Sequence, residues 1–236
     1  RHYAEVHVLI EHASGLHFEN KCSDDDLAKH WQNQILSHLK EKTHRGVLTG
    51  SPLTDVKITL VAGRSHLKHT VGGDFREATY RAVRQGLMEA QSVLLEPYYQ
   101  FQLEIPEKLV GRAMSDVEKM FGNCQLEHTD GVIAHLSGKA PVSTMTHYHM
   151  EVIAYSKGEG KLFTRFGGYD LCHNADEVVT QMGYDVERDR DNPSGSVFCT
   201  QGTGVYIPWN EVKSKMHIDL RSGRPSLKNR VRSGRS

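Results

Sequence analysis

The chain is rich in side chains that could bind a metal or transfer protons, with fifteen histidines and four cysteines. His66 and His69 lie three residues apart, His147 and His149 lie two apart, and Cys172-His173 is an isolated pair. A zinc site needs three or four ligands. None of these pairs has a third ligand at a suitable spacing, and the sequence contains no HExxH motif. We therefore predict no metal site; a histidine-dependent enzyme remains an alternative interpretation.

Two Gly-Lys dipeptides could belong to a phosphate-binding loop, whose GxxxxGK[ST] pattern wraps backbone N–H groups around a phosphate. Gly138-Lys139 is followed by Ala140, and Gly160-Lys161 by Leu162, so the hydroxyl that would meet Mg²⁺ is missing from both. The sequence also lacks a GxSxG elbow and a dinucleotide fingerprint. We predict that this chain carries no catalytic residue and binds no cofactor of its own.

Contact with a polyanion is better supported by the charge distribution. Residues 57–84 carry six basic and two acidic residues, and residues 221–236 carry six basic residues and no acidic one. When these twelve basic and two acidic residues are set aside, the rest holds 17 of the 29 basic and 27 of the 29 acidic residues. Two basic patches on an acidic body favour a polyanionic partner. A solvated helix face with a frayed terminus is the alternative.

The basic loop from Gly63 to Gly73 needs a strand before it and a helix after it. Residues 55–61 alternate between apolar and polar side chains, which predicts a half-buried strand. Small and apolar residues then recur at helical spacing over residues 75–90. Asp74, followed by Glu77, is typical of a capping box at the start of this helix. The loop is therefore expected to be held between two ordered elements.

The remaining elements complete two small domains and an extension. Residues 3–11 and 16–20 read as strands, and a helix is expected from a Ser23 cap to about Thr43. Pro97 marks the boundary to a β–α–β–β–α–β pattern, which is the ferredoxin-like order. Its second helix is expected to bury Val142, Met145, His149 and Ile153. The domains are thus residues 1–95 and 96–170, followed by an extension of residues 171–236. The extension is expected to contain a short helix that begins at an Asn174 cap, a hairpin near residues 197–207, a helix near residues 210–217 and a basic tail. The fold class is α+β.

Composition sets the cellular context. The four cysteines lie far apart without a CxxC pair, which fits a reducing cytosol rather than a disulfide framework. No run of about 18 apolar residues exists, and no signal peptide is visible. We expect a cytoplasmic monomer with no membrane partner. The chain begins at Arg1 and enters a strand pattern almost at once, so we interpret it as a fragment of a longer protein.

One family shares several of these features. The run Leu53 to Leu60, then Gly63, the loop, Phe75 and the Leu94-Leu95-Glu96-Pro97 junction resembles the fourth domain of elongation factor G. Asp74-Phe75-Arg76 and residues 94–98 are closer still to the tetracycline ribosomal-protection proteins, which are paralogues of elongation factor G. Residues 154–161 are similar to a segment of that family's fifth domain. The resemblance covers about residues 1 to 170.

The resemblance implies a parent translational GTPase whose upstream domain binds GTP and Mg²⁺. The first domain would contain a left-handed β–α–β unit, an exception to the usual crossover rule. Its loop tip would enter the decoding centre of the small ribosomal subunit, and the second domain would lie at the stalk base of the large subunit. The expected rRNA-binding residues are Arg64, Ser65, His66, Leu67, Lys68, His69, Thr70, Val71, Gly72, Lys157 and Lys161.

The loop itself departs from both relatives, so three functions stay open. Ribosomal-protection proteins carry Ser-Pro-Val in this loop, whereas this chain has Leu67-Lys68-His69-Thr70. Elongation factor G has acidic and serine residues after its tip histidine, and Lys68 and His69 reverse that charge. The three alternatives are a ribosomal-protection protein, a housekeeping elongation factor G-like factor without drug protection, and a stand-alone RNA-binding protein.

Overall fold

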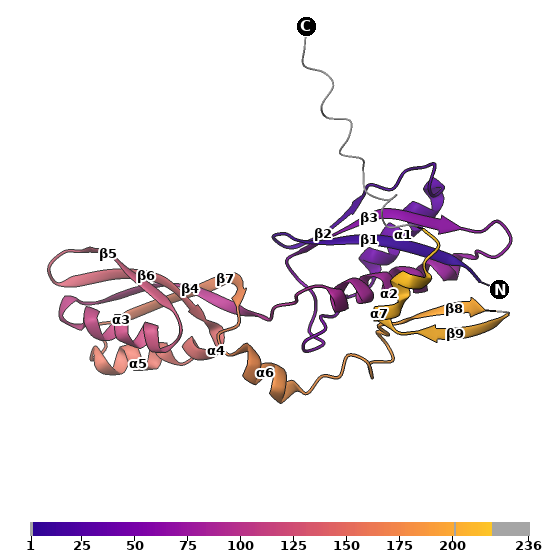
Figure 1. The fold of residues 1–236 in the computed structure, drawn as a ribbon. Helices are drawn as coiled ribbons and strands as arrows, with labels where there is room; N and C mark the ends of the chain where they lie inside the picture. Colours follow the sequence, from indigo (N-terminus) through magenta and orange to yellow (C-terminus); the bar gives the residue numbers. More distant parts are fainter. Residues whose placement is uncertain (1, 201, 219–236) are drawn as a thin grey trace, which may run out of the picture. The chain divides into compact units, whose positions relative to one another are not determined.

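The computed structural model describes residues 2–200 and 202–218, which form two compact units (Figure 1). The first unit contains residues 2–92 together with the described residues from Gly183 onward, and the second contains Val93–Met182. The first boundary lies three residues from the one expected at 95/96. The stretch expected to be a separate extension is divided between the units, because Cys172 N–H donates to Leu94 O while Tyr184 bonds to Arg84.

The first unit is a three-stranded sheet covered by helices. Strands β1 (Ala4–His12), β2 (Leu16–Asn20) and β3 (Val56–Ser65) lie in the order β1-β3-β2, with β1 antiparallel and β2 parallel to β3. Helix α1 (Lys29–Glu41) connects the parallel pair, so β2, α1 and β3 form a β–α–β unit. Helix α2 (Gly72–Glu89) follows β3. The core of this unit is built from Ile35, Leu39, Ile58, Leu60 and Phe75, all fully buried.

Both helices of the first unit begin at residues other than those predicted. Helix α1 starts at Lys29, not near Ser23, because the buried Gln32 amide donates to Ser23 O, Asp24 Oδ1 and Leu27 O and holds a separate turn there. Helix α2 starts at Gly72, so Asp74 is its third residue and accepts from Val71 N–H at 2.9 Å.

The second unit has the predicted ferredoxin-like order. Strands β4 (Leu95–Pro106), β5 (Asn123–Thr129), β6 (Ile133–Pro141) and β7 (Lys161–Leu171) form an antiparallel sheet in the order β5-β6-β4-β7. A 3₁₀ turn, η1 (Glu107–Leu109), leads into α3 (Val110–Lys119), and α4 (Val142–Met145) and α5 (Tyr148–Tyr155) precede β7. The α+β fold class and the β–α–β–β–α–β pattern are confirmed.

The predicted buried face of the second helical segment is wrong in its second half. Met145 is buried as expected, but Tyr148 and Val152 are buried in place of His149 and Ile153, and Ile153 is exposed. The reason is a break between α4 and α5 at Thr146 and His147, which shifts the phase of the helix.

The chain after β7 contains the elements that the sequence indicated. Helix α6 (Ala175–Met182) ends the second unit, and β8 (Ser196–Thr200), β9 (Thr203–Ile207) and α7 (Trp209–Lys215) follow in the first. The basic tail predicted after Leu220 lies outside the described residues. Within residues 2–200 and 202–218, no helix has the length and apolar character to cross a membrane.

Candidate nucleic-acid interface

The loop expected to contact RNA joins two elements that share one core. Strand β3 buries Ile58 and Leu60, and α2 buries Phe75, Val83 and Leu87 in the same hydrophobic cluster. Residues 66–71 connect the end of β3 to the start of α2 and are the turn that follows the β3 arrow in Figure 1. Because both ends of the loop are anchored in the core, its position relative to the sheet is set by packing.

Hydrogen bonds fix the conformation within the loop. Thr70 Oγ1 accepts from His66 N–H at 2.7 Å and donates to Tyr3 O at 2.6 Å. Tyr3 N–H in turn donates to His69 O at 2.9 Å, which ties the loop to the chain just before β1. His66 O accepts from the N–H groups of both His69 and Thr70, at 3.1 and 3.0 Å, and closes a turn. These hydrogen bonds therefore hold the loop in one defined conformation.

The two histidines of the loop stack on each other. Their ring centroids are 4.5 Å apart with an interplanar angle of 24°. Lys68 N–H donates to His66 Nδ1 at 3.2 Å. In the neutral ring this places the proton on Nε2, because only one ring nitrogen can accept when the other carries hydrogen. His66 thus offers an N–H donor and an aromatic face.

The outer surface of the loop combines basic and apolar side chains. Leu67 is fully exposed at the apex, and more than half of Val71 is exposed. Arg64 and Lys68 are exposed, and Ser65, His69 and Thr70 are half-buried. Such a surface offers cations for phosphates and apolar or aromatic faces for unstacked bases.

Two glycines begin helix α2, and their backbone conformation does not require glycine. Neither Gly72 nor Gly73 has a positive φ. A Cβ on Gly72 would lie 3.3 Å from Gln34 Nε2, which donates to Gly72 O, whereas a Cβ on Gly73 would meet no atom within 4 Å. The position of Gly73 therefore has room for a larger side chain.

The two lysines predicted from the fifth-domain segment lie in the second unit, so they are not part of the loop surface. Lys157 is exposed and follows α5 with a φ of 55°. Lys161 begins β7, with its side chain 67% exposed and its Nζ 4.0 Å from Glu104 Oε2. They form a separate candidate contact. Their contact with RNA, like that of the loop residues, stays a prediction.

Sequence reasoning missed an acidic residue beneath the loop. Glu5 of β1 accepts from Tyr3 Oη and from the backbone N–H groups of His217 and Ile218, and it lies 2.8 Å from His7 Nε2. Burial alone would raise the pKa of Glu5, but the hydrogen bonds from His7, Ile218 and Tyr3 outweigh it and lower the pKa to about 2. No local pattern signals this, because two of its partners lie more than 200 residues away.

The grouping of the histidine, cysteine and carboxylate side chains bears on metal binding, and the pKa values of two thiols bear on their reactivity. Within the described part of the chain, no group of three or more histidine, cysteine or carboxylate side chains could hold a metal ion. Burial raises the pKa of the Cys22 and Cys124 thiols, that of Cys124 to about 11, which makes both poor nucleophiles.

Known proteins match both units of the chain. The family model described as elongation factor G, domain IV, matches residues 1–91, and the one described as elongation factor G C-terminus matches residues 93–178. The tetracycline resistance protein TetP of Clostridium perfringens is 33% identical over 170 residues, which are 71% of this chain and 26% of TetP.

A solved structure shares the fold. A crystal structure of a protein from Thermus thermophilus matches with a TM-score of 0.68 and 24% identity, over 76% of this chain and 28% of that protein. The chain therefore spans about a quarter of the length of the relatives that it matches. By the two family models and the homology to TetP, it belongs to the elongation factor G family, as a domain IV followed by a C-terminal domain.

Proposed function

We propose that this chain is the ribosome-binding C-terminal part of a translational GTPase, and that the loop of residues 64–72 contacts rRNA of the decoding centre. The observation that supports this most is the loop itself, which is exposed, basic and fixed by Tyr3, His66 and Thr70. A fixed loop loses little conformational entropy on binding, so more of its contact energy contributes to affinity.

Each loop residue has a role that fits its chemistry. Arg64 and Lys68 neutralise phosphates, His66 stacks on a base or donates from Nε2, and Leu67 packs on an unstacked base. Ser65, His69, Thr70, Val71 and Gly72 give the loop its shape and its backbone surface. Lys157 and Lys161 supply a second contact with rRNA, at the stalk base of the large subunit.

The complete protein would work in the cytoplasm on the ribosome. Its GTP-binding domain, upstream of this chain, would bind GTP and Mg²⁺ and hydrolyse the nucleotide. The two units of this chain would supply ribosome contacts and no catalytic group, which agrees with the lack of a phosphate-loop motif in the sequence.

Removing the two exposed cations of the loop tests the proposed interface. We expect the double variant Arg64→Ala/Lys68→Ala to bind ribosomes more weakly and to reduce the slope of log K against log salt by about two units, because each cation neutralises one phosphate. The measurement is ribosome binding by cosedimentation at several salt concentrations.

The matched control is Lys29→Ala/Arg188→Ala, which removes the same two types of charge from exposed positions of the first unit. This variant should bind like the wild type. An unchanged slope in the loop variant, or an equal change in the control, would contradict the binding of rRNA by the loop.

Two roles in translation remain candidates. Homology to TetP favours a ribosomal-protection protein, and the Leu67-Lys68-His69-Thr70 sequence of the loop favours an elongation factor G-like factor without drug protection. Drug susceptibility of tetracycline-sensitive cells that express the full-length protein separates them. Growth at raised tetracycline concentration identifies the first role, and unchanged susceptibility with normal expression identifies the second.

A further inference from the structure

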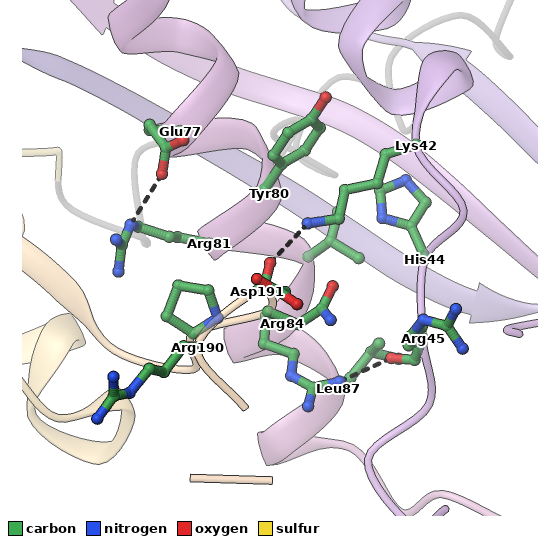
Figure 2. A pocket seen from close by; sticks show the side chains of 13 residues that line it. Lys42, His44, Arg45, Glu77, Tyr80, Arg81, Arg84, Leu87, Arg190 and Asp191 are labelled. Carbon is green, nitrogen blue, oxygen red and sulfur yellow. Dashed lines mark hydrogen bonds and ion pairs between the residues drawn. The ribbon is translucent and has the colours of Figure 1, made fainter. Parts of the chain in front are cut away.

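The C-terminal segment of the first unit, which consists of the described residues from Gly183 onward, is attached to that unit at its beginning and at its end. Near its beginning, Lys42 Nζ donates to Asp191 O at 3.2 Å, as a dashed line in Figure 2 marks. Near its end, α7 lies against α2 (Figure 1) and buries Val212. The proposed contact between the loop and rRNA does not explain why this segment packs here.

The end of the segment is bonded to one carboxylate. The backbone N–H groups of His217 and Ile218 donate to the two oxygens of Glu5, at 3.2 and 3.0 Å. The His217 side chain lies beside the same group, with its Nδ1 3.5 Å from Glu5 Oε2. Glu5 belongs to β1 and its side chain is only 10% exposed, so water competes weakly for these bonds. They attach the segment to the sheet.

Tyr3 connects Glu5 to the loop. Its hydroxyl donates to Glu5 Oε2 at 2.8 Å, and its ring lies edge to face against the ring of His217, with the centroids 5.4 Å apart. Tyr3 precedes β1, whose pairing with β3 begins at Ala4 and Ser65. The Tyr3 backbone therefore lies outside the ladder of the sheet, and its side chain anchors it.

The Tyr3 backbone holds the loop through both of its polar groups. Its N–H donates to His69 O at 2.9 Å, and its C=O accepts from Thr70 Oγ1 at 2.6 Å. The same Thr70 oxygen accepts from His66 N–H at 2.7 Å. A continuous series of contacts thus runs from the C-terminal segment through Glu5 and Tyr3 to the turn of the loop.

We propose that Glu5 and Tyr3 are positioning residues for the loop of residues 64–72, and that the C-terminal segment holds the loop in its binding conformation through them. A loop that is ordered before it binds loses less conformational entropy on binding, so the packing of the segment raises the affinity of the loop. The inference rests on the proposed contact between the loop and rRNA, whereas the order of the loop can be measured without the ribosome.

Amide hydrogen exchange of the free 236-residue chain measures the order of the loop. Tyr3→Phe removes only the hydroxyl that donates to Glu5. We expect the N–H groups of His66, His69 and Thr70 to exchange about tenfold faster in this variant, because a hydrogen bond to a charged group is lost and the loop opens more often.

Tyr80→Phe is the matched control in the same unit. It removes a tyrosine hydroxyl that donates to another carboxylate, that of Glu41, at 2.6 Å. Tyr80 and Glu41 are not part of the series of contacts from Glu5 to the loop, so the loop should exchange as in the wild type. No acceleration in Tyr3→Phe, or an equal acceleration in Tyr80→Phe, would overturn the positioning role of Tyr3.

Val212→Ala tests the part played by the C-terminal segment. The side chain of Val212 is 3% exposed, so its truncation weakens the packing of α7 on the first unit. We expect the N–H groups of His217 and Ile218 to exchange faster together with those of the loop. Faster exchange at His217 and Ile218 with an unchanged loop would show that the segment does not hold the loop.

Ribosome binding tests whether the order of the loop contributes to affinity. The affinities of Tyr3→Phe and Val212→Ala should fall in proportion to the ordered fraction of the loop, which the exchange rates give. The slope of log K against log salt should stay that of the wild type, because Arg64 and Lys68 are still present.

Two failures are distinguishable. Affinities that do not follow the ordered fraction would overturn the role of the segment in binding. Wild-type affinity and salt slope in Arg64→Ala/Lys68→Ala would instead contradict the proposed contact between the loop and rRNA, and the exchange experiments would still decide whether Glu5 and Tyr3 position the loop.

Discussion

Glu5 is a buried carboxylate on which two distant parts of the chain meet. It holds the side chains of Tyr3 and His7 and the backbone of His217 and Ile218, so it connects β1 to the end of the described chain. Its side chain is 10% exposed. Tyr3 also bonds to the loop through His69 O, so Glu5 supports the proposed interface indirectly.

The lowered pKa of Glu5 predicts a pH-dependent contribution to stability. Its pKa falls from 4.5 to about 2 on folding. The carboxylate therefore stabilises the fold fully above pH 4.5, by up to about 3 kcal/mol, and this contribution is lost as the pH falls towards 2. We expect Glu5→Gln to lower the free energy of unfolding at pH 7, and its difference from wild type to shrink as the pH falls from about 4.5 to about 2.5.

Urea unfolding at several pH values measures this difference. Glu187→Gln is the control, because Glu187 is exposed and its carboxylate makes no ion pair among the described residues. It should match wild type throughout. A Glu5→Gln difference that stays constant over the whole acid range would show that the charge of Glu5 does not stabilise the fold.

Single residues show what local patterns can reveal. Loop residues such as Arg64 and Lys68 could be found because their charge and neighbours in sequence mark an exposed basic loop. Glu5 and Arg84 could not be found, because part of the environment of each comes from residues at least 100 positions away. The local sequence around an acidic residue in a strand, or around an arginine in a helix, does not tell whether that side chain is exposed or buried.

At the level of elements, periodicity predicted which helices and strands exist better than it predicted where they begin and end. The strands around the loop and in the ferredoxin-like sheet follow from alternation, which side-chain burial dictates. The start of α1 and the buried face of α5 were wrong, because Gln32 and the break at Thr146 and His147 act through contacts and backbone geometry that spacing does not encode.

The C-terminal segment is attached to the first unit at Gly50 and Arg84. Gly50 has a φ of 70°, and a Cβ there would lie 2.9 Å from the Tyr184 ring. Arg84 donates to the hydroxyl of the same tyrosine. We expect Gly50→Ala to destabilise the chain by about 1–3 kcal/mol, because alanine strains the backbone and displaces Tyr184. Hydrogen exchange should then show faster opening of residues 183–193.

Gly73→Ala is the matched control within the same unit. Gly73 lies in the first turn of α2, has no positive φ and has open space where a Cβ would stand. Alanine is a better helix former by up to about 1 kcal/mol, so this variant should be as stable as wild type or more stable. Equal destabilisation by both substitutions would contradict the attachment through Tyr184.

At the scale of the whole molecule, the family could be identified from sequence through the strand–loop–helix unit and the Leu94-Leu95-Glu96-Pro97 junction, and the two family models agree with it. The division of the chain could not be foreseen in full. The described residues from Gly183 onward contact the first unit through Glu5, Glu89 and Arg84. No change in composition along the sequence predicts this long-range packing.

Binding of decoding-centre rRNA by the loop tip can be tested with a cleavage reagent placed at the tip. Leu67 is fully exposed, so Leu67→Cys can carry a tethered iron chelate in a chain where the exposed Cys199 is replaced by serine. Arg188→Cys in the same background is the control position.

Hydroxyl radicals generated from position 67 on ribosome-bound protein should cleave rRNA in the decoding centre of the small subunit, and those from position 188 should give a different pattern. Cleavage at the decoding centre from position 67 is the result that we expect. Cleavage of other rRNA only, or the same pattern from both positions, would contradict the placement of the loop at the decoding centre.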